Sequence, residues 1–133
     1  FVSSIILLFF DLNHLKKMND THGHESGDKL IRSFAECIQS AFGRHATVGR
    51  MGGDEFIVIF EDMTGIDIEE QLEFYKKELV KCNKANPDLH ISAAYGFCSK
   101  AEEPGLDAKE IYRKADGRMY ECKVAMKCQR TKE

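Results

Sequence analysis

Two short acidic segments carry residue types that could bind a metal ion. In the run from Gly52 to Glu55, paired glycines predict a tight hairpin turn that brings two carboxylates to the start of a strand. Asp11 lies where a buried strand is expected to end. If these strands are neighbours, Asp11 converges with Asp54 or Glu55, and the Leu12 carbonyl adds another oxygen. Such hard oxygen ligands suit Mg²⁺. The alternative is a set of solvent-facing acids.

Lysines follow Asp11 within about one helical turn. Lys16 and Lys17 could neutralise the terminal phosphates of a nucleotide if a metal is bound beside them. The alternative is the solvated face of a helix, and we favour that interpretation for Lys17.

The segment from residue 19 to residue 28 is rich in glycine and leads into a helix start. His24 or Ser26 is a plausible helix cap. The amide of Asn19 and the carboxylate of Asp28 could instead bind a guanine, because guanine offers an N1–H and an exocyclic amine to an acid and adenine does not. A metal pair formed by His22 and His24 is disfavoured, since no third soft ligand lies nearby.

The hydrophobic pattern predicts the elements that must position these residues. Ile5–Leu12 is apolar on both faces, as in a central covered strand. Apolar spacing then predicts helices and further strands. The expected order is a strand at 5–12, a short helical turn and loop to 24, a helix around 30–42, hairpin strands near 46–51 and 54–61, a helix over 67–83, a strand over 89–99 and a helix over 107–126. This order predicts an α+β sandwich with a largely antiparallel sheet.

Composition narrows the class of protein. The 133 residues suffice for one domain, and a net charge of −3 disfavours general binding of nucleic acid. The five cysteines show no C-x-x-C spacing, which is typical of reduced thiols in a cytoplasmic protein. The longest apolar run is too short to cross a bilayer, so we expect no direct membrane contact from this domain, although a longer parent protein could be membrane-anchored. We interpret the chain as an N-terminally truncated fragment of a longer protein.

Three segments together resemble a known family. They are the run from Asp11 to Asp28, the run from Arg50 to Phe56, and Ala115-Asp116 with Tyr120 and Lys123. In order and spacing they are similar to the GGDEF-domain diguanylate cyclases, and the resemblance covers nearly all of residues 1–133. It implies a single GGDEF domain with a palm-like (nucleotidyl cyclase or ferredoxin-like) α+β fold.

The resemblance also implies a reaction and a set of roles. Two GTP molecules, one on each domain of a homodimer, condense to cyclic di-GMP with release of two pyrophosphates. Asp11, Asp54 and the Leu12 carbonyl would hold Mg²⁺ (or Mn²⁺), and Asp54 or Glu55 would help to deprotonate the attacking hydroxyl. The remaining roles fall to substrate-contacting side chains: Lys16, Lys123 and Lys127 on phosphates, and Asn19, His24 and Asp28 around the guanine. A sensor or other domain in the parent chain would control dimerisation.

The chain departs from the family pattern at several positions. Asn13 replaces a frequent acid, and Lys127 takes the place of a phosphate-binding arginine, so we expect weaker triphosphate binding. Gly43 and Ala46 stand where the family's product-inhibition site has arginine and aspartate, which predicts no tight feedback inhibition there. These departures keep an alternative open, namely a catalytically weak or inactive GTP-binding regulatory module.

Overall fold

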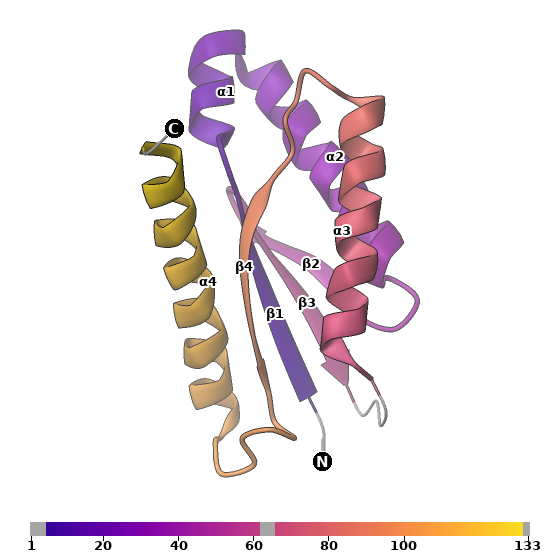
Figure 1. Cartoon of the computed structure of the whole chain (residues 1–133), viewed down its shortest axis with the longest axis vertical. Helices are drawn as coiled ribbons and strands as arrows, with labels where there is room; N and C mark the ends of the chain where they lie inside the picture. Colours follow the sequence, from indigo (N-terminus) through magenta and orange to yellow (C-terminus); the bar gives the residue numbers. More distant parts are fainter. Residues whose placement is uncertain (1–4, 62–65, 132–133) are drawn as a thin grey trace.

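The computed structural model describes residues 5–61 and 66–131. Four strands and four helices follow one another in these residues (Figure 1). They are β1 Ile5–Leu12, α1 Leu15–His22, α2 His24–Phe42, β2 Thr47–Gly52, β3 Glu55–Glu61, α3 Ile68–Ala85, β4 Ala93–Ser99 and α4 Ala108–Thr131. Within the described part of the chain, no helix combines the length and apolar character that spanning a membrane requires.

The strands form one sheet in the order β2-β3-β1-β4, and every neighbouring pair is antiparallel. The predicted α+β architecture is therefore confirmed. In the central pairing, Phe10 lies opposite Phe56 and Asp11 lies opposite Glu55. This register places the end of β1 beside the start of β3.

Helices cover both faces of the sheet, with α2 and α3 on one side and α4 on the other (Figure 1). Successive side chains of β1 point to opposite faces of the sheet. Leu8 and Phe10 join the core under α2 and α3, whereas Leu7 and Phe9 join the core under α4. This double burial explains why the sequence of β1 is apolar without alternation.

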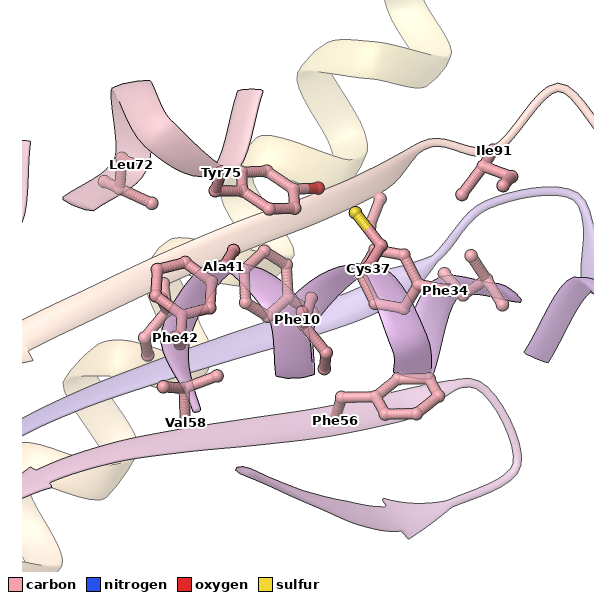
Figure 2. Close-up of a cluster of buried hydrophobic side chains, with 14 of the residues drawn as sticks. Phe10, Phe34, Cys37, Ala41, Phe42, Phe56, Val58, Leu72, Tyr75 and Ile91 are labelled. Atoms are coloured by element: carbon pink, nitrogen blue, oxygen red, sulfur yellow. The ribbon is translucent and has the colours of Figure 1, made fainter. Parts of the chain in front are cut away.

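An aromatic cluster fills the core between the sheet and the α2–α3 layer (Figure 2). Phe10 lies at its centre and contacts Phe34, Phe42 and Tyr75, with ring centroids 5.0 to 6.0 Å apart. Tyr75 and Phe42 are stacked, with an interplanar angle of 19°. Such ring pairs add to the stabilisation from area burial.

Tyr75 is 2% exposed, and its hydroxyl has no hydrogen-bond partner. Burial raises the pKa of this phenol, so it stays neutral. A buried unpaired hydroxyl costs about 1–3 kcal/mol. We therefore expect Tyr75→Phe to raise the free energy of unfolding by about 1 kcal/mol, measured by urea denaturation. The matched control is Tyr112→Phe, because Tyr112 is 41% exposed and should give almost no change. A lower midpoint for Tyr75→Phe would contradict this account.

Three local predictions were wrong in detail. The strand expected over 89–99 begins only at Ala93. The segment after β1 forms a complete helix, α1, which has no fully buried residue and so lacks an apolar signal. The hairpin turns at Gly53 and Asp54, because a bulge between Arg50 and Gly52 shifts the register by one residue. The guanidinium of Arg50 fixes this turn by donating to the Gly53 carbonyl at 2.7 and 3.0 Å.

The predicted side-chain cap of α2 was also wrong. The residue before α2 is Gly23, with φ 86°, and it makes no side-chain capping bond. The Ser26 hydroxyl donates instead to the carbonyl of His22, at 3.3 Å. Gly23 is the single residue between α1 and α2, and the bend between the helices requires its positive φ. Glycine adopts this conformation without strain, whereas residues whose side chains cap helices do so less readily.

Candidate metal and nucleotide site

Three carboxylates meet at one end of the two central strands. Asp11 is near the end of β1, Glu55 begins β3, and Asp54 lies in the turn between β2 and β3. The backbone N–H of Leu12 donates to the Asp54 carbonyl at 2.8 Å, which fixes the turn against β1. One oxygen from each carboxylate lies within 4.8 Å of the others. The predicted convergence of these acids is confirmed.

The three acids repel one another because their like charges lie close together. Burial raises the pKa of Asp11; the Lys123 ammonium opposes this shift, and the charge of Asp54 adds to it. Burial likewise raises the pKa of Glu55, with the charges of Asp11, Asp116 and Asp54 adding to the effect. A cation placed among these oxygens would relieve the repulsion.

Lys123 supplies part of that positive charge. Its Nζ lies 2.7 Å from Oδ1 of Asp11, and both side chains are largely buried. Apart from this ammonium, the buried carboxylate oxygen has no polar partner. Three carboxylates with one ammonium beside them still carry excess negative charge, which fits a hard divalent cation such as Mg²⁺.

A glycine sets the position of α4, the helix that carries Lys123. A Cβ at Gly96 on β4 would lie 2.1 Å from the backbone N of Met119 and 2.7 Å from the carbonyl of Ala115. Helix and strand backbones therefore touch, and no larger residue fits between them. Ile111, Ala115 and Met119 are buried on the same side of the sheet.

Asn13 ties three elements together beside the acids. It is 3% exposed, and its Nδ2 donates to Ser92 Oγ at 3.1 Å and to Met126 Sδ at 3.5 Å. Its backbone N–H donates to the Ser92 carbonyl at 2.8 Å. This residue therefore links the end of β1 to the segment before β4 and to α4. No local pattern around Asn13 indicates that role, because its side-chain partners are 79 and 113 residues away.

A cavity of about 450 Å³ adjoins the acids. The predicted phosphate-binding lysines Lys16, Lys123 and Lys127 all line it, together with Asp54 and Leu12. Lys17, which we expected on a solvated helix face, is exposed and also lines this cavity. Lysines around a cavity next to a metal-binding cluster suit a phosphorylated ligand.

The three predicted guanine-binding residues lie apart from this cavity, on α1 and the start of α2. Asn19 is half-buried on α1, while His24 and Asp28 are exposed on α2. The amide of Asn19 lies directly over Gly27, where a Cβ would come within 1.7 Å of Asn19 Oδ1. Gly27 thus allows α1 and α2 to pack closely at Asn19. Asp28 directly follows Gly27 on α2, so the close packing also brings its backbone near Asn19.

Asp116 is a charged neighbour of the site whose position the sequence did not predict. It is exposed on α4, and its charge contributes to the raised pKa of Glu55. Only the packing of α4 beside β1 and β4 brings this acid near the end of β3. The helical pattern of α4 could indicate its buried face but not the strand that it faces.

Comparisons with known proteins agree with this geometry. The family model described as "Diguanylate cyclase, GGDEF domain" matches residues 2–129. The diguanylate cyclase DgcS of Shewanella oneidensis is 28% identical over 128 residues, which cover 92% of this chain and 40% of DgcS. The probable diguanylate cyclase DgcT of Escherichia coli is 30% identical over 120 residues, which cover 88% of this chain and 26% of DgcT. The chain thus spans less than half the length of either relative.

Solved structures show the same fold. The GGDEF domain of DgcB from Caulobacter crescentus, crystallised with c-di-GMP, superposes with a TM-score of 0.76 at 30% identity. The match covers 92% of this chain and 73% of that one. The palm-like fold that the resemblance implied is therefore confirmed. With the family model matching almost end to end, the chain belongs to the GGDEF-domain family of diguanylate cyclases.

Proposed function

We propose that this domain condenses two molecules of GTP into cyclic di-GMP with release of two pyrophosphates. The observation that carries the proposal is the convergence of Asp11, Asp54 and Glu55 within 4.8 Å, beside a cavity lined by lysines. Carboxylates that hold a divalent cation next to phosphate-binding cations are the parts that phosphoryl transfer needs. Membership of the family supports the same reaction.

Each residue of the site has a physical task in this reaction. Asp11, Asp54 and the Leu12 carbonyl would hold Mg²⁺ (or Mn²⁺), and a bound divalent cation offsets the negative charge that develops on the phosphoryl oxygens. Glu55 or Asp54 would accept the proton of a ribose 3′-hydroxyl. The hydroxyl oxygen then bonds to the α-phosphorus of the other GTP, and the bond from that phosphorus to the leaving pyrophosphate oxygen breaks. A second, equivalent step closes the ring.

Lysines and polar side chains would hold the nucleotide. Lys16 would steady the phosphates during attack, and Lys123 and Lys127 would bind the terminal phosphates. Lys127 supplies charge but not the bidentate fork of an arginine, which supports weaker triphosphate binding. Asn19 and Asp28 would hydrogen-bond the guanine edge, with His24 beside them. These assignments favour GTP over ATP.

One domain holds one GTP, so synthesis would require two domains facing each other as a homodimer. A sensor or other domain of a longer parent chain would then control activity by bringing two copies together. GTP and reduced cysteines are both typical of the cytoplasm, which is the location we propose.

The test is product analysis by mass spectrometry. The chain is fused to a dimerising coiled coil and incubated with GTP, ATP and Mg²⁺. Cyclic di-GMP that disappears in Asp54→Ala would support both the reaction and the metal role. GTP binding without any dinucleotide product would instead support the second candidate, a GTP-binding regulatory module. The observation that favours this candidate is that the chain has Lys127 where the family has a phosphate-binding arginine.

Gly27 gives a direct test of the guanine-binding assignment. Gly27→Ala places a Cβ 1.7 Å from Asn19 Oδ1 and must displace that amide. We expect GTP affinity to fall about tenfold, which is the loss of about 1.4 kcal/mol of hydrogen bonding. Binding is measured by calorimetry. Gly117→Ala in α4 is the control, because nothing lies within 4 Å of its Cβ and both substitutions raise helix propensity equally. Equal GTP affinity in the two variants would argue against a role for Asn19.

Feedback inhibition is expected to be weak. Gly43 and Ala46 occupy the positions where the family's product-inhibition site has arginine and aspartate, and neither residue has a polar side chain that could bind a phosphate or a guanine. Titration with cyclic di-GMP should therefore show no tight binding next to the hairpin. Tight binding there that GTP does not displace would contradict this prediction.

A further inference from the structure

A second cavity adjoins the one beside the acids, and His14, Lys17 and Thr21 line both of them. It has a volume of about 720 Å³, compared with about 450 Å³ for the cavity beside the acids. Its walls come from α1, from the start of α2 and from the segment Asp88–His90, which precedes β4. A cavity of this size is large enough for a small molecule.

The wall of this second cavity is basic, although the whole chain has a net charge of −3. Lys17 and Lys29 contribute two ammonium groups, and Asp88 contributes a single carboxylate. Three imidazoles complete the polar lining, from His14, His22 and His90. A concave surface that reverses the sign of the overall charge concentrates anions.

Two of these histidines have strained backbones. His14 has φ 68° and His90 has φ 50°, and among the described residues they are the only non-glycine positions with positive φ. Such conformations cost free energy and are maintained where the surroundings require them, often at binding sites. Here both of them line one cavity, His14 from just before α1 and His90 from the segment before β4.

The chemistry of the wall favours an anion over a metal ion. Among the described residues, the one group of three or more ligating side chains close enough to share an ion is the catalytic cluster Asp11, Asp54 and Glu55, so the three histidines do not form a metal site. Ammonium groups, imidazole N–H groups and the Thr21 hydroxyl are donors suited to phosphate oxygens.

We propose that this cavity binds a phosphate-bearing small molecule, separately from the catalytic site. The phosphate would contact Lys17 and Lys29, and the rest of the ligand would occupy the volume toward His90. The Asp88 carboxylate would accept a hydrogen bond from a hydroxyl or amino group of the ligand. Because His14, Lys17 and Thr21 line both cavities, the new ligand would lie next to the proposed nucleotide site.

The test uses this chain in EDTA, so that no metal-dependent binding contributes. Inorganic phosphate and AMP are titrated separately, and binding is followed by calorimetry and by backbone NMR shifts. The shifts that count are those of the residues that line this cavity and not the other one: Met18, His22, Ser26, Lys29 and residues 88–90. We expect saturable binding with shifts at these residues. Lys29→Gln should weaken it about tenfold, and Lys109→Gln, on the first turn of α4, is the matched control. Tighter binding of AMP than of phosphate identifies a nucleotide ligand, whereas equal affinity identifies the phosphate group alone.

His90→Gly separates binding from folding. Glycine takes φ 50° without strain, so this variant should be at least as thermally stable as the original chain while it binds more weakly. The proposal is overturned if no saturable binding occurs, if the shifts map to Lys123 and Lys127 instead, or if Lys29→Gln and His90→Gly bind as tightly as the original chain. None of these results depends on cyclase activity.

Discussion

Lys123→Met is expected to tighten Mn²⁺ binding to the nucleotide-free domain about tenfold and to weaken GTP binding. Lys123 Nζ lies 2.7 Å from a carboxylate oxygen of Asp11, which the proposed mechanism assigns to the metal. An incoming cation must displace this ammonium or bind against its charge. At about 4 Å and an effective dielectric constant of about 20, that repulsion is worth about 4 kcal/mol per unit charge. Movement of the lysine relieves most of this repulsion in the original chain. We therefore expect the substitution to make the free energy of Mn²⁺ binding more favourable by only about 1.4 kcal/mol, which is tenfold in affinity.

The same contact predicts that metal and GTP bind cooperatively. When a triphosphate arrives, Lys123 can leave Asp11 for the phosphates, and the carboxylate is then free to bind the metal. Each ligand therefore removes an obstacle to the other, and the coupling is reciprocal. The measurement is Mn²⁺ titration by electron paramagnetic resonance, with and without a non-hydrolysable GTP analogue. In Lys123→Met, the analogue should no longer enhance Mn²⁺ affinity.

Lys16→Met is the matched control for this experiment. Lys16 lines the same cavity, and none of the ion pairs found among the described residues joins it to the acids. This variant should weaken GTP binding and leave Mn²⁺ affinity unchanged. If Lys123→Met binds Mn²⁺ as weakly as the original chain, the idea that Lys123 competes with the metal fails, while the cyclase assignment is unaffected.

Glu55→Gln is expected to abolish dinucleotide synthesis and at the same time stabilise the metal-free domain at pH 7. In the proposed mechanism Glu55 helps to deprotonate the ribose 3′-hydroxyl. We therefore expect activity to fall by about 10²–10⁴-fold, as it does when a general base is removed. Its pKa is raised above 4.5 by burial and by the charges of Asp11, Asp116 and Asp54. A neutral side chain of the same shape removes this repulsion.

The raised pKa of Glu55 also determines how the stability of the folded domain changes with pH. A carboxyl whose pKa is higher in the folded state than in the unfolded state binds protons more tightly when folded. The folded state is then penalised as pH rises from about 4.5 through the raised pKa, and the full penalty is present at neutral pH. Asp11 contributes in the same direction. Thermal denaturation in EDTA at pH 4 and pH 7 should show the largest gain for Glu55→Gln at pH 7.

Glu61→Gln controls for a general effect of removing negative charge. Glu61 is exposed at the other end of β3, opposite Ile5 and away from the acids. It should change neither the activity nor the pH dependence of the melting temperature. Added Mg²⁺ should stabilise the original chain and the Glu61 variant but not Glu55→Gln to the same extent. A Glu55→Gln domain that melts lower at pH 7 would contradict the proposed repulsion.

The sheet and the acidic cluster could be predicted because their signals are local. β1 is apolar on both faces with Asp11 as its last residue but one, and paired glycines indicate the hairpin that carries Asp54. Antiparallel pairing then leaves one register that puts these acids at the same end. The apolar stripes of α2, α3 and α4 predicted that these helices exist, although α2 begins at His24, six residues before its apolar stripe.

Other parts of the site depend on tertiary packing that no local pattern records. α1 has no buried stripe because it lies at the edge of the fold. The ion pair between Asp11 and Lys123 depends on the angle at which α4 crosses the sheet, which the contact at Gly96 sets. The partner of Asn13 on α4 and the influence of Asp116 on Glu55 follow from the same contact. Sequence spacing along α4 cannot define that angle.

The strand order has a consequence for synthesis on the ribosome. β1 is central in the sheet, yet it is the first described strand to be translated, and its pairing with β4 joins Ile6 to Ser99. At about 5–20 residues per second, one edge of this apolar strand waits ~5–20 s for its partner. During that time, both the exposed edge and the incomplete core can bind other chains. We therefore expect nascent chains that stop before β4 to depend on chaperones.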